Sequence, residues 1–415
     1  MAIPATQRGR TPCANQLRST SRLALTSIVT LLPIVCSPVF AATAPHKAGL
    51  GATLTAADGG EIFGFDIDQN GNDGVLASSQ DVNDNGETLV SVETFDQDTG
   101  KITKSFARKM GTHLSYGVDG IFTGDVGLVT RFFTPTNSPH DAATRTYELM
   151  NPVTANKFTG KWTPPIKDLS VLQAAENQAT GTSVLFAIEL KNNDKPDLIV
   201  SNVAANSFGN VIHLDPDLFG GADGPQLGLY SAANEAVIAL SPDAGAVGEP
   251  GEAPINVVIN LSTGASTQFN GFNNGTFGAG EVNGLAVDPN TGIGATTTEL
   301  NAQVEFYNMA SETGVSAAQL PCTGPEDEAF SGGGVAVDQV NKLFLVAAPD
   351  ACDDGNVGAI EVYDESGKFI EAIKGFTGFP VGGPPFVINP DKRMGWALGT
   401  AAGGKSLAEL QQFFY

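Results

Sequence analysis

The sequence predicts an all-β fold in which a four-stranded antiparallel unit repeats seven times. Three observations predict it. Apolar strands ending in Asp or Asn recur at intervals of 50 to 57 residues, with the Asx residue at Asp68, Asp125, Asn177, Asn234, Asp288, Asp338 and Asn389. A second hairpin of the Asx-x-x-Gly type follows in several units, at residues 95–101, 259–264, 307–314 and 363–368. The 49 Gly residues and a charged content of 16% suit short strands and tight turns better than long helices.

Each unit is expected to contain two hairpins. The Asx side chain closes its own backbone turn, and the Gly that follows accepts a positive φ. Four-stranded units of roughly 40 to 50 residues are typical of the blades of a β-propeller. The expected blades are residues 61–107, 115–163, 168–215, 226–270, 280–320, 331–376 and 384–415, the last completed by residues 49–57. A long β-sandwich array is the alternative, but it explains the regular spacing less well.

The two ends of the repeated region are expected to pair with each other. The last unit has candidate strands at 386–389, 395–399 and 407–415, and then the chain stops. A spare strand precedes the first unit, at about 49–56. Pairing it with the last unit completes that unit and hides both terminal edges, so we expect a closed ring.

The first 42 residues have the pattern of a secretory leader. Four arginines (Arg8, Arg10, Arg18 and Arg22) precede an apolar run at 23–35, and small residues follow at 37–44. The pattern predicts cleavage near Ala41 or Ala42, a single mature domain at 43–415, and a secreted, periplasmic or extracellular location. A membrane anchor is the alternative, but the run is shorter than the roughly 20 residues that span a bilayer. A lipoprotein signal is a further alternative, because Cys36 closes the run, although no small residues precede it.

The charge excludes some classes of partner. The chain has 22 Lys and Arg against 45 Asp and Glu, a formal charge of −23 that deepens to −27 when residues 1–42 are removed. Nucleic-acid binding requires a basic face, so it is not expected. A hydrophobic content of 41% with 24 Phe is enough for a core, which argues against disorder. We expect a monomer without a membrane span after cleavage.

Two cysteines, Cys322 and Cys352, remain in the mature chain. An even number of cysteines in an exported protein is most simply one disulfide. A catalytic thiol is the alternative, but it needs a neighbouring His or cation, and acids flank both residues. In a four-stranded blade the two loops that carry these cysteines emerge on the same face, so the disulfide is expected to join them.

The repeated turns resemble those of a known group. Residues 285–292 (Leu-Ala-Val-Asp-Pro-Asn-Thr-Gly), 335–342 and 386–393 are similar to the turns of the YVTN and NHL class of β-propellers. The resemblance covers nearly the whole mature chain, and it implies the fold. It implies no particular activity, because one fold carries many functions.

The loops that link the second and third strands of a unit, and those that link one unit to the next, share one face, which we call the upper face. Its longest and most varied segments include 80–87, 135–141, 191–197, 215–223 and 324–328. Variable loops on a rigid scaffold favour binding of a protein partner or a small-molecule ligand. The candidate acids on this face are Asp81, Asp84, Glu87, Asp217, Asp223, Glu326, Asp327, Asp353 and Asp354. The alternative interpretation of these charges is solubility alone.

Two segments resemble calcium loops. Alternating oxygen side chains around a Gly turn occur at Asp66, Asp68 and Asn70 and again at Asp81, Asn83 and Asn85. Such oxygens suit a hard cation, but the bidentate Glu of an EF-hand is missing, since the twelfth positions are Ala77 and Val92. Ordinary Asx-rich turns produce the same pattern. Calcium is therefore the cofactor to test, and no other is expected.

Signals of catalysis are sparse. The four histidines show no metal-ligand spacing, and no Gly-x-Ser-x-Gly motif occurs. Glu61, His113, Glu281 and Asn283 precede first strands, where side chains can face a central channel, and the resemblance to propeller lactonases and lyases implies such a site. Their alternative role is to cap loops. The sequence thus favours a non-catalytic binding protein, with a lactonase- or lyase-like enzyme and a calcium-binding adhesive protein as the alternatives.

Overall fold

The computed structural model divides the chain into residues 1–42 and 43–415, and the fold belongs to the second of these units. The described residues are 47–415 except for 58, 70, 82–86, 113–119, 124–126, 133–145, 151–159, 163–164, 167–168, 178–179, 190–194, 203–206, 220–222, 242–254, 270–281, 299–302, 321–333, 349–356, 378–385 and 400–408. The predicted leader lies outside them and stays a prediction. None of the helices in the described part of the chain has the length and hydropathy to cross a bilayer.

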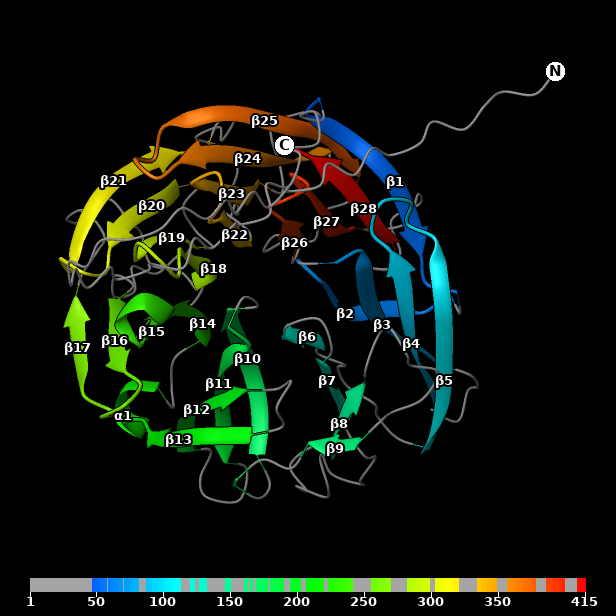
Figure 1. The fold of residues 1–415 in the computed structure, drawn as a ribbon, viewed down its shortest axis with the longest axis horizontal. Coiled ribbons are helices and arrows are strands. Elements are labelled where there is room, and N and C mark those ends of the chain that lie inside the picture. Colours follow the sequence, from blue (N-terminus) through cyan, green and yellow to red (C-terminus); the bar gives the residue numbers. More distant parts are fainter. Residues whose placement is uncertain are drawn as a thin grey trace, which may run out of the picture. The chain divides into compact units, whose positions relative to one another are not determined.

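Within the described residues, the strands form seven four-stranded antiparallel sheets (Figure 1). The first holds β2 (Glu61–Ile67), β3 (Asp73–Asp81), β4 (Glu87–Asp96) and β5 (Ile102–Thr112). The second holds β6 (Gly120–Thr123), β7 (Gly127–Phe132), β8 (Thr146–Met150) and β9 (Gly160–Trp162). The third holds β10 (Leu169–Asn177), β11 (Thr182–Glu189), β12 (Lys195–Asn202) and β13 (Ser207–His213).

A short helix, α1 (Pro216–Phe219), precedes the fourth sheet, and a 3₁₀ turn, η1 (Ser231–Ala233), lies within it. The fourth sheet holds β14 (Asp223–Tyr230), β15 (Glu235–Ser241), β16 (Ile255–Asn260) and β17 (Ser266–Phe269). The fifth holds β18 (Val282–Val287), β19 (Ile293–Thr298), β20 (Gln303–Asn308) and β21 (Thr313–Gln319). The sixth holds β22 (Val335–Asp338), β23 (Leu343–Ala348), β24 (Val357–Asp364) and β25 (Phe369–Thr377). The seventh joins β26 (Phe386–Asn389), β27 (Met394–Gly399) and β28 (Glu409–Phe414) to β1 (Gly49–Thr55).

The first strands of the sheets contact one another in sequence. The strand β2 contacts β6, β6 contacts β10, and the contacts continue through β14, β18 and β22 to β26, which contacts β2 again. Figure 1 shows these strands around the centre and the fourth strands at the outside. A closed circuit of four-stranded antiparallel sheets is a β-propeller, so the predicted all-β class and propeller architecture are confirmed.

The predicted pairing of the two ends is also confirmed. Strand β1 pairs with β28 in antiparallel register, from Gly49 opposite Phe414 to Thr55 opposite Glu409. The side chain of Gln412 reinforces the pairing, because its Oε1 accepts a hydrogen bond from the Ala52 N–H at 2.9 Å. A Cβ at position 51 would lie 2.2 Å from that same Oε1 atom, so a larger residue than Gly51 would have to displace the Gln412 side chain.

The predicted turn residues close turns and also tie one sheet to the next. The Asp288 Oδ1 accepts hydrogen bonds from the backbone N–H groups of Asn290 and Thr291, and Gly292 follows with a φ of 71°. On its other side, Asp288 accepts from Lys342 of the sixth sheet at 2.6 Å. Equivalent ties join Asn177 to Ser231, Asp338 to Tyr415, and Asn389 to the carbonyl oxygen of Asp68. Asp125 lies outside the described residues.

The core lies between neighbouring sheets. Leu198 and Phe186 of the third sheet pack with Leu229 and Ile238 of the fourth. The first and last sheets meet where the fully buried Trp396 packs against Phe95 in a T-shaped arrangement, with ring centroids 5.2 Å apart. A sheet that is covered on both faces has middle strands that are buried almost continuously, as in β23, where all six residues are buried.

Candidate functional site

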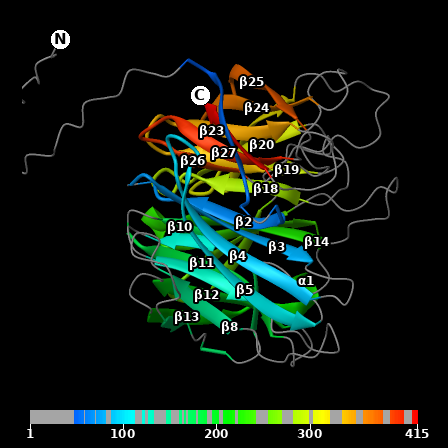
Figure 2. The ribbon, with the colours of Figure 1, turned by 90° about the vertical axis from the view of Figure 1, so that its right-hand side faces the viewer.

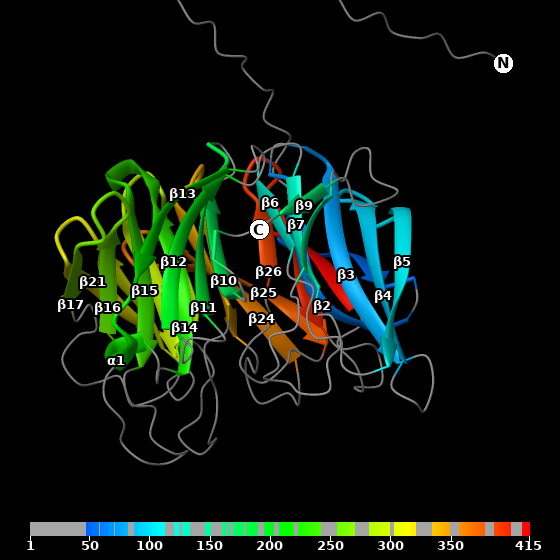
Figure 3. The same ribbon diagram turned by 90° about the horizontal axis from the view of Figure 1, so that it is seen from below.

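The connections at the two ends of the sheets differ in length. At one end, which we call the turn face, the strands are joined by the turns that begin at the Asx residues, such as 288–292 and 339–342. At the upper face several connections are longer, and they include 133–145, 242–254 and 320–334. Figures 2 and 3 show the sheets from the side, with α1 at the upper-face end of the third and fourth sheets. The connections of the upper face therefore vary in length from one sheet to the next more than those of the turn face do.

On the turn face, several of the described Asx side chains are hydrogen-bonded within their own turns. The Asp96 Oδ1 accepts from the N–H of Thr99 at 2.9 Å, and the Asp364 Oδ1 accepts from the N–H of Ser366 at 2.9 Å. The Ser366 hydroxyl also donates a hydrogen bond to the Asp364 Oδ1, and this bond is the main cause that lowers the pKa of Asp364. Side chains that stabilise turns in this way are committed to the scaffold.

The residues predicted to face a central channel are only partly described. Glu61 is exposed and begins β2, rather than preceding it, opposite Ser79 of β3. Asn283 lies inside β18 and is half-buried, and its buried Nδ2 atom has no hydrogen-bond partner among the described residues. These two strands belong to sheets that are not neighbours in the circuit. His113 and Glu281 lie outside the described residues, so a convergent channel site stays a prediction.

The first candidate calcium loop forms a turn that joins sheets. The Asp66 Oδ1 accepts a hydrogen bond from the Ile67 N–H at 2.8 Å. Asp68 is 4% exposed, and its carbonyl oxygen accepts from the Gln97 Nε2 at 2.7 Å and from the Asn389 Nδ2 at 3.3 Å. These contacts are made by the Asp68 backbone carbonyl and not by its carboxylate, so calcium binding at this loop stays a prediction. Asn70, Asn83 and Asn85 lie outside the described residues, as do Cys322 and Cys352, and nothing is described of the Asp81 side chain at the end of β3.

A cluster that the sequence patterns do not reveal lies in the third sheet. Glu189, Asp197 and His213 each offer a ligand atom, and these atoms all lie within 4.8 Å of one another. The His213 Nδ1 is 2.7 Å from the Asp197 Oδ1. Among the residues that the structure describes, this is the one group of three or more His, Cys, Asp or Glu side chains close enough to share a metal ion.

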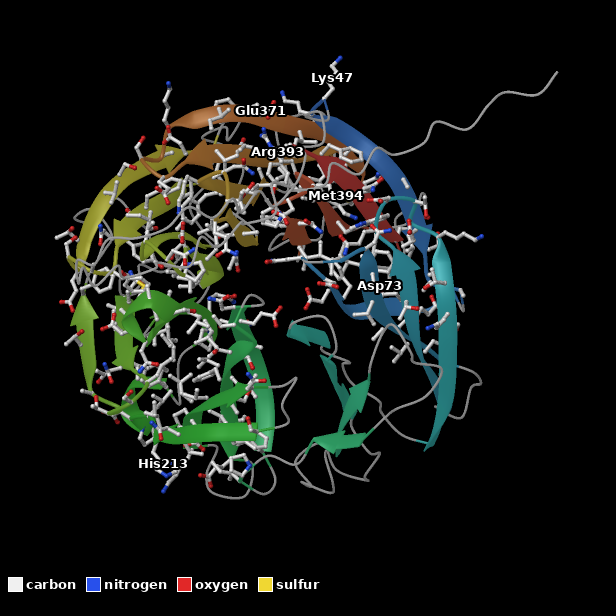
Figure 4. All side chains as sticks on the ribbon, viewed as in Figure 1. Lys47, Asp73, His213, Glu371, Arg393 and Met394 are labelled. Atoms are coloured by element: carbon white, nitrogen blue, oxygen red, sulfur yellow. The ribbon has the colours of Figure 1, made fainter. Side chains whose placement is uncertain are left out.

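The sheet register brings the three side chains together. His213 of β13 stands opposite Asp197 of β12, and Ala187 of β11 stands opposite Asp197 on the other side, so that Glu189 is its diagonal neighbour. Asp197 lies on the opposite sheet face from Leu198, which packs against the fourth sheet. Figure 4 shows His213 at the outer edge of the third sheet.

Burial sets the electrostatics of this cluster. The Asp197 side chain is fully buried, whereas the His213 side chain is 74% exposed. Burial raises the pKa of Asp197, the hydrogen bond and charge of His213 oppose that rise, and the charge of Glu189 adds to it. The sequence signal for the cluster is faint, because the three residues are separated along the chain and only strand pairing makes them neighbours.

The comparisons with known proteins support the fold. No family model matches the sequence, and no curated protein matches it. Among solved structures, the Dos1 propeller is similar with a TM-score of 0.51 and 10% identity, covering 88% of this chain and 95% of that one. Chaetomium thermophilum Sqt1, bound to the N-terminus of ribosomal protein L10, is similar with a TM-score of 0.55 and 12% identity, covering 89% and 100%. At these identities, the likeness shows a β-propeller fold and nothing of function. The predicted YVTN and NHL resemblance is not confirmed.

Proposed function

We propose that the mature chain is a secreted seven-bladed β-propeller that binds a protein partner through its upper face. The observation that carries the proposal is the contrast between the two faces. Turn-face residues such as Asp288 and Asn389 are engaged in turns and in ties between sheets, whereas the long and variable connections gather at the upper face. Variable loops on a rigid scaffold are the usual place for recognition.

The charge and one structural neighbour support a particular kind of partner. A formal charge of −23 favours a basic segment, because complementary charge speeds encounter and selects partners. The Sqt1 propeller is bound to the N-terminus of another protein, which is a precedent for a propeller that takes a peptide segment. We infer that an extended basic segment of the partner contacts the upper-face acids, with the predicted Cys322–Cys352 disulfide fixing two of the loops.

A matched pair of charge variants tests this proposal. The first carries Glu326→Gln, Asp327→Asn and Asp353→Asn in upper-face connections. The second carries Asp98→Asn, Glu312→Gln and Asp391→Asn, three exposed turn-face acids, so that both variants lose the same charge. The probe is a fluorescent Lys- and Arg-rich peptide of about ten residues, compared with its Glu-substituted counterpart.

We expect the wild type to bind the basic peptide, the upper-face variant to bind it about tenfold less tightly, and the turn-face variant to bind like the wild type. Raising the salt concentration should weaken the binding, because exposed charges are screened. Equal losses in the two variants, or equal binding of the acidic peptide, would show that the upper face is not the recognition surface.

A further inference from the structure

The cluster in the third sheet has the composition and spacing of a metal site. It consists of one imidazole and two carboxylates, presented by three consecutive strands that hold one another in register. The ligand atoms of Glu189, Asp197 and His213 lie within 4.8 Å of one another. Tetrahedral coordination at about 2.0 Å requires ligand atoms about 3.3 Å apart, so small side-chain rotations are enough to reach it.

A buried carboxylate oxygen of this cluster lacks a hydrogen-bond donor in the described part of the chain, which indicates that a ligand can bind beside it. Asp197 is fully buried, and its Oδ1 is hydrogen-bonded to the His213 Nδ1. Its Oδ2 is also buried, and no described residue donates a hydrogen bond to it. Leaving a buried acceptor unsatisfied is costly, so native proteins usually provide a partner, either a proton, a water molecule or a cation.

The donor set selects the class of cation. Ca²⁺ and Mg²⁺ prefer oxygen ligands alone, so an imidazole in the set argues against them. Imidazole together with carboxylates suits a divalent transition metal, and zinc is commonly held by three such protein ligands with a fourth position open. His213 is 74% exposed, which leaves that fourth position accessible to water or to a side chain of another molecule.

We propose that Glu189, Asp197 and His213 form a binding site for a divalent transition metal, zinc being the best match. Bound there, the ion ties the outer strand β13 to β11 across β12 and satisfies the buried Asp197. The site lies at the upper-face end of the third sheet, because Glu189 ends β11 and Asp197 lies near the start of β12, but metal binding there does not require the peptide partner proposed above.

The test is a titration of the full chain after treatment with a chelator. Isothermal titration with Zn²⁺ is expected to give one site per chain, and Ca²⁺ and Mg²⁺ are expected to give none there. Co²⁺ in place of Zn²⁺ should give visible absorption from a four-coordinate site. His213→Gln removes an exposed side chain and should leave the fold intact, yet it should weaken zinc binding at least about 100-fold. Asp197→Asn should do the same.

Lys195→Met is the matched control. Lys195 stands opposite Glu189 in the β11–β12 ladder, so the change alters the local charge without removing a ligand. Zinc should then bind as tightly as to the wild type or more tightly. The proposal is overturned if the wild type binds no zinc, if Ca²⁺ competes equally, or if His213→Gln binds zinc like the wild type while circular dichroism shows it folded.

Discussion

Replacing Glu361 with glutamine should make the protein more stable at neutral pH. Glu361 lies on β24 and is 1% exposed. The Tyr363 hydroxyl donates a hydrogen bond to its Oε2 at 2.5 Å. Burial raises the pKa of Glu361 to about 7, and the hydrogen bond from Tyr363 and the charge of Lys374 oppose that rise only in part.

The sign and size of the effect follow from linkage. In the unfolded chain the carboxyl has its ordinary pKa of 4.5, and in the folded protein about 7. Below pH 4.5 the Glu361 carboxyl is protonated in both states and does not lower the free energy of unfolding. Above pH 7 it is ionised in both states, and the folded state carries the free-energy cost of removing the charge from water. At 1.36 kcal/mol per pKa unit, the free energy of unfolding falls by about 3 kcal/mol between these pH values. Glutamine, which stays neutral, should not show that fall.

Chemical denaturation of wild type and Glu361→Gln from pH 4.5 to 8 measures the difference. We expect the two to differ least at pH 4.5, and the variant to gain up to about 3 kcal/mol at pH 8. The gain is an upper bound, because the glutamine Nε2 must also find an acceptor. Glu371→Gln, on the paired strand β25 and half-exposed, is the control and should follow the wild type. Parallel pH curves for wild type and Glu361→Gln would refute the argument.

Three further changes test the scaffold by thermal melts. Lys342→Met leaves the fully buried Asp288 without its cation and, because Lys342 is 43% exposed, should cost about 1–3 kcal/mol; an unchanged Tm would contradict this tie. Deleting 407–415 removes β28 and with it both pairings that close the seventh sheet, so the cooperative transition should vanish; a truncated protein that melts normally would refute closure. Gly292→Ala puts a Cβ at a φ of 71° and 2.7 Å from the Tyr230 ring, so it should cost at least about 1 kcal/mol. If Gly292→Ala has the same stability as the wild type, the turn relaxes without cost and the argument from its φ is wrong.

The parts of the fold that were predictable from sequence are those with a local cause. The turn at 288–292 was predictable because Asp288 closes it through its own side chain and Gly292 accepts the positive φ. The pairing of β1 with β28 followed from a missing strand at one end and a spare strand at the other. The short helix α1 was missed, since its four residues are too few to show a helical periodicity.

The metal cluster was not predictable, because its cause is not local. Glu189, Asp197 and His213 become neighbours only through the register of three strands, and the β12–β13 register shifts between Ile199 and Ser201. Sequence spacing alone gives no means to place that irregularity. Histidine motifs that are recognisable in a sequence have helical spacings, whereas this site is built across a sheet.

Some of the acids that make up the net negative charge are buried and do not lie on the surface. Seven acids are buried among the described residues: Asp68, Glu93, Asp197, Asp288, Glu305, Asp338 and Glu361. Three of them share a position, since Glu93, Glu305 and Glu361 each stand three residues before the Asx residue that ends a third strand. Glu93 accepts hydrogen bonds there from the Ala57 N–H and the Ser105 hydroxyl.

A charge buried in this way acts inside the fold and contributes little to the field that a partner meets. The formal charge of −23 therefore overstates the acidity of the surface. It follows that attraction of a basic partner must come from exposed acids, and that neutralising a few of them at the upper face removes a larger share of the effective charge than the total suggests. This is why a variant that loses only three carboxylates is a sensitive test of where the partner binds.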